Sequence, residues 1–274
     1  MVKGAALSFV LVLGGPAAVR AQMLVSSARQ MPAGSVKFTL FYQGVQGQEL
    51  NFKVTGGGSC VGGVAPPASN VAFPCGSSGD VAASADGGMV VLQAMGQPWE
   101  GLQYYGSIGV GDLTLRLSSV TATNVLTGDR PGYQYALGTR AILIPDTVVG
   151  PAVTLDARLM WQRHHFNRID PPSGAGAASI DERLDLYQYQ VALETSHRFD
   201  LPGKWSVEPY GGVKWLRAES SLKDLGNGDR VGGIKDTVTP FVGLVVPIFE
   251  REALVAEGSF VDGYHYSAGL QVRF

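Results

Sequence analysis

Apolar and polar residues alternate along much of this 274-residue chain. The clearest segment is the C-terminal one, whose apolar face consists of Tyr264, Tyr266, Ala268, Leu270, Val272 and Phe274. Because successive side chains of a β-strand point to opposite faces, this period of two predicts strands with one apolar and one polar face. The alternation recurs in residues 36–43, 101–111, 149–161, 187–194 and 205–215. The chain is therefore predicted to be all-β.

Turns and loops divide the chain into ten predicted antiparallel strands. They cover residues 34–50, 88–97, 101–113, 132–144, 148–167, 184–199, 205–220, 237–249, 253–260 and 264–274. Short turns alternate with longer polar or glycine-rich connections, except for a tight turn at 261–263, and this asymmetry is typical of membrane barrels. The segment 34–55 is either one long strand or a hairpin that turns at Gln46–Gly47–Gln48. Eight and twelve strands therefore stay open.

The composition favours a protein that faces lipid. Charged residues make up 16% of the chain, against about 25% in an average soluble domain. Glycine contributes 37 of the 274 residues, whereas it makes up only about 7% of an average soluble domain. Beyond the N-terminus no apolar run reaches the roughly 20 residues of a membrane-spanning helix, so a closed β-barrel is the remaining way to cross a bilayer. With 21 basic and 23 acidic residues, no nucleic-acid partner is expected.

The N-terminus has the features of a secretory signal peptide. Lys3 precedes an apolar stretch at 5–13, and Val19 and Ala21 suit the two key positions before a cleavage site after Ala21. A retained membrane anchor is the alternative, although the apolar stretch is short for one. The predicted organisation is a signal peptide at 1–21, an N-terminal periplasmic segment at 22–33, and a barrel with outer loops at 34–274.

The alternating C-terminal strand, which ends on Phe274, resembles that of Gram-negative outer-membrane β-barrel proteins. The resemblance implies a transmembrane antiparallel up-and-down β-barrel in the bacterial outer membrane, surrounded by lipid and lipopolysaccharide. It also implies that the barrel-assembly machinery recognises the terminal strand, here through Tyr266, Leu270 and Phe274.

Aromatic residues near predicted strand ends suit the two belts that such barrels place at the membrane surfaces. Trp205 and Trp215 share a face and lie ten positions apart, and a tilted strand crosses the membrane in roughly 9–11 residues. Phe274 falls at the end with short turns. Trp161 and Phe166 fall at the end with long connections and are predicted to belong to the outer belt.

The polar face of the strands carries charges of both signs, which we expect to point into the lumen. They are Lys37, Arg140, Asp156, Arg158, Glu194, Glu208, Lys214, Glu257 and Arg273. Inside a small barrel these groups either pair across the lumen or line a narrow aqueous path.

The remaining reactive residues favour no catalytic site. Cys60 and Cys75 lie in a glycine- and proline-rich loop, where export favours a disulfide over two free thiols. Two cysteines are too few for structural zinc. His164 and His165 are expected to be solvated residues at the rim. No enzyme activity, metal or cofactor is predicted.

These features predict an outer-membrane barrel with a structural or small-porin role and exposed loops. The alternatives are a channel for small or hydrophobic solutes and an outer-membrane hydrolase. The sequence makes no prediction of oligomeric state.

Overall fold

The computed structural model describes residues 28, 30–54, 79–118, 123–147, 150–170, 177–202, 205–226, 228, 230–261 and 263–274. No helix in these ranges is long and apolar enough to cross a membrane. The predicted signal peptide and the predicted disulfide between Cys60 and Cys75 lie outside the described residues.

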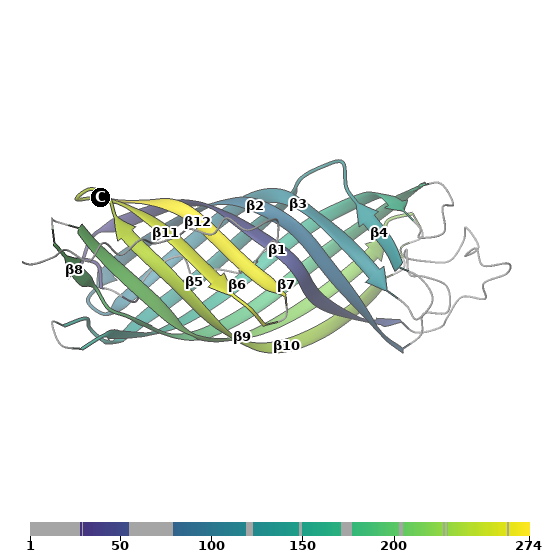
Figure 1. Cartoon of the computed structure of the whole chain (residues 1–274). Coiled ribbons are helices and arrows are strands. Elements are labelled where there is room, and N and C mark those ends of the chain that lie inside the picture. The colour runs from purple at the N-terminus through teal and green to yellow at the C-terminus, as the bar shows by residue number, and fades with distance from the viewer. Residues whose placement is uncertain are drawn as a thin grey trace, which may run out of the picture.

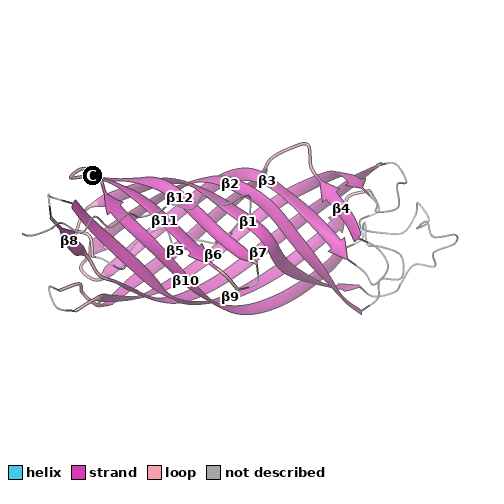
Figure 2. Cartoon of the chain, viewed as in Figure 1, coloured by secondary structure: helices cyan, strands magenta, loops and turns pink. Residues whose placement is uncertain are grey.

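The described chain is built from antiparallel strands that wind around one barrel (Figures 1 and 2). They are β1 (Val36–Val54), β2 (Gly79–Trp99), β3 (Leu102–Ser118), β4 (Thr123–Thr127), β5 (Gly132–Ile144), β6 (Ala152–Asp170), β7 (Ala178–Ser196), β8 (Phe199–Leu201), β9 (Trp205–Asp224), β10 (Arg230–Pro247), β11 (Glu252–Ser259) and β12 (Tyr264–Arg273).

The first and last strands close the barrel. β1 pairs with β2 on one side and with β12 on the other, from Lys37 opposite Arg273 to Gln46 opposite Tyr264. β4 and β5 share one position between β3 and β6, and β8 is a short ribbon on β9. The ring therefore has ten positions, which confirms the predicted up-and-down barrel of about ten strands.

The segment 34–55 contains one strand, and the alternative of a hairpin at Gln46–Gly47–Gln48 is wrong. A register shift between Val45 and Gln48 marks a β-bulge there, and Gly47 adopts a φ of 70°. A bulge bends a strand without ending it. Directly beside it, Gly263 at the tip of the β11–β12 hairpin abuts the backbone of residues 46–48.

Eight ring positions continue beyond the short β11–β12 hairpin, which ends early (Figure 1). There β10 and β1 pair directly, with Gly232 opposite Lys53, and the Lys235 ammonium lies 2.5 Å from a carboxylate oxygen of Glu49. We call this eight-stranded part the extension and the ten-stranded part the membrane section. Predicted strands at 34–50 and 88–97 were too short because both strands run on into the extension.

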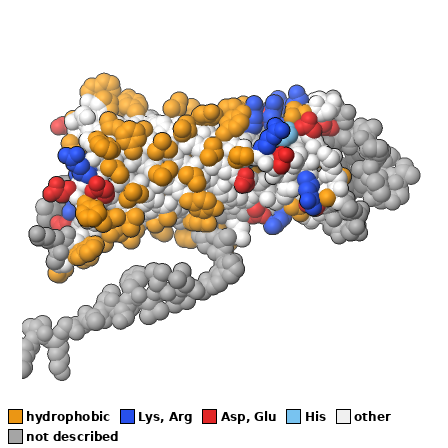
Figure 3. Space-filling view, turned by 90° about the horizontal axis from the view of Figure 1, so that it is seen from above, with side chains coloured by type: hydrophobic (Ala, Val, Ile, Leu, Met, Phe, Trp, Pro, Cys, Tyr) orange, Lys and Arg blue, Asp and Glu red, His pale blue; other side chains and the backbone are white. Residues whose placement is uncertain are grey.

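The polarity of the wall reverses between the two parts. In the membrane section apolar side chains cover the outer surface, whereas charged side chains gather on the extension (Figure 3). The interior of the extension is an apolar cluster, which consists of Leu50, Phe52, Ala83, Ala85, Leu115, Leu117, Leu126, Phe166, Leu184, Leu186, Ala218 and Leu222. An eight-stranded barrel is just wide enough for side chains to fill it.

This reversal corrects the prediction that Phe166 belongs to the outer aromatic belt. Phe166 is fully buried inside the extension, because β6 continues past the membrane and positions of its parity point inward. Trp161 has the opposite parity and stacks on Tyr135 on the outer wall. Trp205 at the start of β9 and Trp215 near the middle of that strand both face outward, ten residues apart, as two belts across the membrane require.

Candidate functional site

The lumen of the membrane section is the candidate site, because the inward positions of the strands concentrate polar side chains there. Eight of the nine predicted lumen charges are buried inside it, each no more than 6% exposed: Lys37, Arg140, Asp156, Arg158, Glu194, Glu208, Lys214 and Glu257. Arg273 has the same parity but lies at the mouth of the lumen opposite the extension, where it is exposed.

Arg140 on β5 is the centre of one buried network. Its Nε lies 3.2 Å from Oδ2 of Asp156, and its Nη2 lies 3.2 Å from Oε2 of Glu194. Tyr105 donates a hydrogen bond of 2.8 Å to Oδ1 of Asp156. All of these groups come from neighbouring strands β3, β5, β6 and β7. A buried charge is tolerated when it is paired and hydrogen-bonded in this way.

A second network lies around Glu257 on β11. Tyr210 donates a 3.1 Å hydrogen bond to Oε2 of Glu257, and the Lys214 ammonium lies 3.8 Å from Oε1. The same ammonium lies 5.5 Å from the centre of the Phe241 ring. The Tyr210 ring covers Gly243, where any side chain would collide with it. Tyr105 covers Gly138 in the same manner, so two of the strand glycines make room for lumen tyrosines.

Buried glutamines extend these networks, and the sequence did not single them out. Gln134 accepts hydrogen bonds from Gln43 at 2.7 Å and from Gln162 at 2.9 Å. Gln103 donates to Gln97 at 3.0 Å. Their inward-pointing positions can be read from the sequence, but a search restricted to charged residues does not identify uncharged amides.

The lumen charges balance, and their burial describes a filled interior. Four basic side chains face four acidic ones in the membrane section. A water-filled path would leave its lining accessible to solvent, yet the side chains of Arg140, Asp156 and Glu194 have no exposed surface. The described part of the membrane section is therefore filled by buried polar side chains, among which Arg140 pairs with Asp156 and Glu194 and Lys214 pairs with Glu257. The extension beyond it is filled by the apolar cluster.

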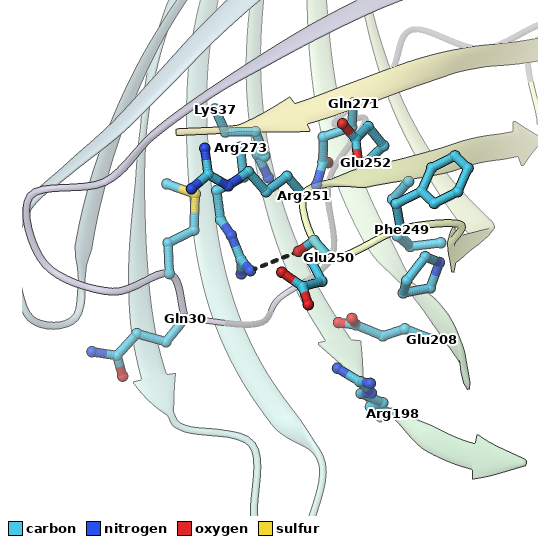
Figure 4. A pocket seen from close by; sticks show the side chains of 14 residues that line it. Gln30, Lys37, Arg198, Glu208, Phe249, Glu250, Arg251, Glu252, Gln271 and Arg273 are labelled. Atoms are coloured by element: carbon cyan, nitrogen blue, oxygen red, sulfur yellow. Dashed lines mark hydrogen bonds between the residues drawn. The ribbon is translucent and has the colours of Figure 1, made fainter. Parts of the chain in front are cut away.

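The mouth of the lumen at the end opposite the extension is narrowed by the segment before β1. Met31 is buried against Met95 and Tyr105, and its backbone N–H donates a 2.9 Å hydrogen bond to Gln97. Beside it lies a pocket of about 190 Å³, whose labelled lining includes Lys37, Glu208, Arg251 and Arg273 (Figure 4). Arg273 donates a 3.2 Å hydrogen bond to the Glu250 carbonyl oxygen at the rim. Because Lys37 and Glu208 are themselves buried, the pocket stops at the packed lumen.

The two adjacent histidines point in opposite directions. His164 is buried inside the barrel, whereas Nε2 of His165 lies 2.7 Å from Oδ1 of Asp181 on the outer wall of the extension. The expectation of two solvated rim residues is therefore wrong for His164, since the extension encloses it. Within the ranges given above, no three potential ligands are grouped to hold a metal ion.

Comparison with known proteins agrees with this architecture. The family model of the autotransporter β-domain matches residues 118–222, which run from the end of β3 into β9 and make up less than half of the chain. No curated protein sequence matches the chain. The outer membrane protease OmpT of Escherichia coli is similar with a TM-score of 0.51 at 9% identity, over 90% of this chain and 100% of that one. The translocator domain of the autotransporter NalP from Neisseria meningitidis gives 0.46 at 12% identity, over 89% of each chain.

The closed antiparallel ring and its apolar outer surface define the fold: the chain is an up-and-down β-barrel with the fold of the outer membrane protease OmpT. The autotransporter β-domain model that matches residues 118–222 indicates the bacterial outer membrane as its location. Its likeness to OmpT shows a shared fold, and a fold does not determine an activity.

Proposed function

We propose that the protein is a non-conducting structural barrel that anchors in the outer membrane and carries its long connections on the extension. The observation that supports this proposal is the packing of both lumen compartments. Buried polar side chains, with ion pairs around Arg140 and Glu257, fill the membrane section. The apolar cluster around Phe166 fills the extension. Of the two roles expected from the sequence, the structural one fits this interior better than the small-porin one.

An open channel would require the side chains that fill these two compartments to move apart. Breaking the contacts of Arg140 would leave Asp156 and Glu194 as buried carboxylates without that partner, which costs about 3–5 kcal/mol. The apolar cluster would also have to admit water beside leucine and phenylalanine side chains, and apolar cavities stay dry. Both costs favour a barrel that stays closed at equilibrium.

A non-enzymatic role is part of the same proposal. The side chains of Asp156, Glu194 and Glu257 have no exposed surface to offer a substrate. The pair His165–Asp181 lies on the outer wall, where both side chains are partly exposed. A contact between a partly exposed histidine and a carboxylate is typical of solvated surface ion pairs, which need no catalytic role.

Swelling of proteoliposomes in isotonic sugar solutions tests the proposal. The mature protein, folded into vesicles and checked by its heat-modifiable mobility, should admit neither small sugars nor amino acids above the rate of empty vesicles. A porin of known bore supplies the positive control. Swelling that changes with Lys214→Gln in the lumen, but not with the matched outer-wall variant Arg116→Gln, would establish conduction through the lumen and overturn the proposal.

A further inference from the structure

An aromatic cluster occupies the outer wall where the membrane section meets the extension. It is formed by Tyr133 and Tyr135 on β5, Trp161 on β6 and Tyr187 on β7. The Trp161 ring stacks between Tyr135 and Tyr187, with ring centres 5.9 Å and 6.4 Å apart, and Tyr133 meets its edge at 5.5 Å. Four aromatic rings on three neighbouring strands provide a broad surface at headgroup level.

Two guanidinium groups lie next to this cluster on the side of the extension. The Arg163 guanidinium is 4.9 Å from the centre of the Trp161 ring, a distance typical of a cation–π contact. Arg163 and Arg183 both bind Asp185, with Nε–Oδ distances of 2.6 Å and 3.1 Å. The three charged groups sum to one positive charge. Both arginine side chains remain 30% exposed, so both are accessible from the outer surface.

Two apolar grooves lie on the lipid side of the cluster. One has a volume of about 280 Å³, with Leu137, Leu159 and Tyr189 in its lining. The other has a volume of about 300 Å³, with Leu40 and Ile108 in its lining. Tyr135 contributes to both grooves, so they flank one residue of the aromatic cluster.

We propose that this face binds one molecule of a phosphorylated, multiply acylated glycolipid of the outer leaflet, of the lipid A type. Its phosphate lies against Arg163 and Arg183, since guanidinium groups bind phosphate through paired hydrogen bonds. Its acyl chains fill the grooves on both sides of Tyr135, and its sugar rings cover the aromatic cluster. The site lies next to the water-exposed extension, which places it in the outer leaflet. Two separate grooves favour a lipid with several acyl chains.

Native mass spectrometry of the detergent-solubilised mature protein tests the site with three lipids: bis-phosphorylated lipid A, its dephosphorylated form, and phosphatidylglycerol. We expect a one-to-one complex with the first and at least about tenfold weaker binding of the second, because charge-assisted hydrogen bonds are lost. Phosphatidylglycerol, which has two acyl chains and a diester phosphate, should also bind at least about tenfold more weakly.

Variants identify the residues responsible. Arg163→Gln with Arg183→Gln should weaken lipid A binding by at least about tenfold, while Arg116→Gln, which removes an outer-wall arginine paired with Asp86, should leave it unchanged. Arg183→Gln alone serves if the double variant does not fold. Unchanged binding by the Arg163 and Arg183 variants, or equal binding of phosphatidylglycerol, would overturn the proposal. Neither outcome bears on conduction, which the swelling assay measures separately.

Discussion

Replacing Arg140 with glutamine is the sharpest perturbation of the lumen. The side chain is fully buried and contacts Asp156 and Glu194 at 3.2 Å each. At an effective dielectric constant of about 20, an ion pair at such a distance has a Coulomb energy of roughly 5 kcal/mol, which desolvation largely offsets while both partners are present. Removing only the cation keeps the desolvation penalty and loses the compensation. We therefore expect the free energy of unfolding to fall by about 3–5 kcal/mol.

Urea unfolding in phospholipid vesicles measures this change through tryptophan fluorescence and heat-modifiable mobility. The expected loss corresponds to roughly two to three and a half orders of magnitude in the unfolding equilibrium constant, at about 1.4 kcal/mol per factor of ten. Arg168→Gln is the matched control. It removes an exposed arginine from its 2.8 Å pair with Asp170, and such pairs contribute about 0–1 kcal/mol.

A triple variant separates charge compensation from lost packing. Arg140→Gln combined with Asp156→Asn and Glu194→Gln removes all three charges and should recover much of the lost stability, because no carboxylate then lacks its cation. If Arg140→Gln alone changes the free energy of unfolding by less than about 1 kcal/mol, water reaches these groups and the filled lumen is refuted.

Three further predictions concern other parts of the barrel. Phe166→Ala should reduce the free energy of unfolding by about 3–5 kcal/mol in the same urea assay, because the side chain fills the apolar extension; an effect below about 1 kcal/mol would mean that the cluster is not packed. Gly243→Val should destabilise the barrel by about 1–3 kcal/mol, since a Cβ there meets a lumen tyrosine, whereas a neutral effect would argue against that contact. Phe274→Ala should lower the amount of folded protein in isolated outer membranes without reducing its refolding in detergent, if the terminal residue serves assembly rather than stability.

The sequence was sufficient for the ring because lipid imposes a simple rule on the membrane section. Outward positions must be apolar there, so the alternation around Tyr266 and Leu270 gives both the strand and its orientation. The lumen charges followed from parity in the same way. Arg140 on β5 lies directly opposite Asp156 on β6. The alternation within one strand does not predict this register between two strands.

The extension escaped prediction because that rule ends with the membrane. Where the wall faces water, the apolar side chains point inward. Phe166 is at an inward-pointing position of β6 and is therefore buried in the extension, not exposed at a lipid-facing belt. Small residues such as Ala83 and Ala85 also line the narrow interior, and in the sequence they resemble loop residues. Only the direct pairing of β10 with β1 above the short hairpin explains why eight strands suffice there.

The closed lumen is tested most directly by single-molecule current recording in planar bilayers at high salt. The refolded mature protein, inserted at high load, should give no discrete current steps, because Arg140, Asp156 and Glu194 fill the membrane section and the apolar cluster fills the extension. Reproducible steps of one size, whose ion selectivity changes on replacing Glu208 or Lys214, would contradict a filled lumen and identify the protein as a pore.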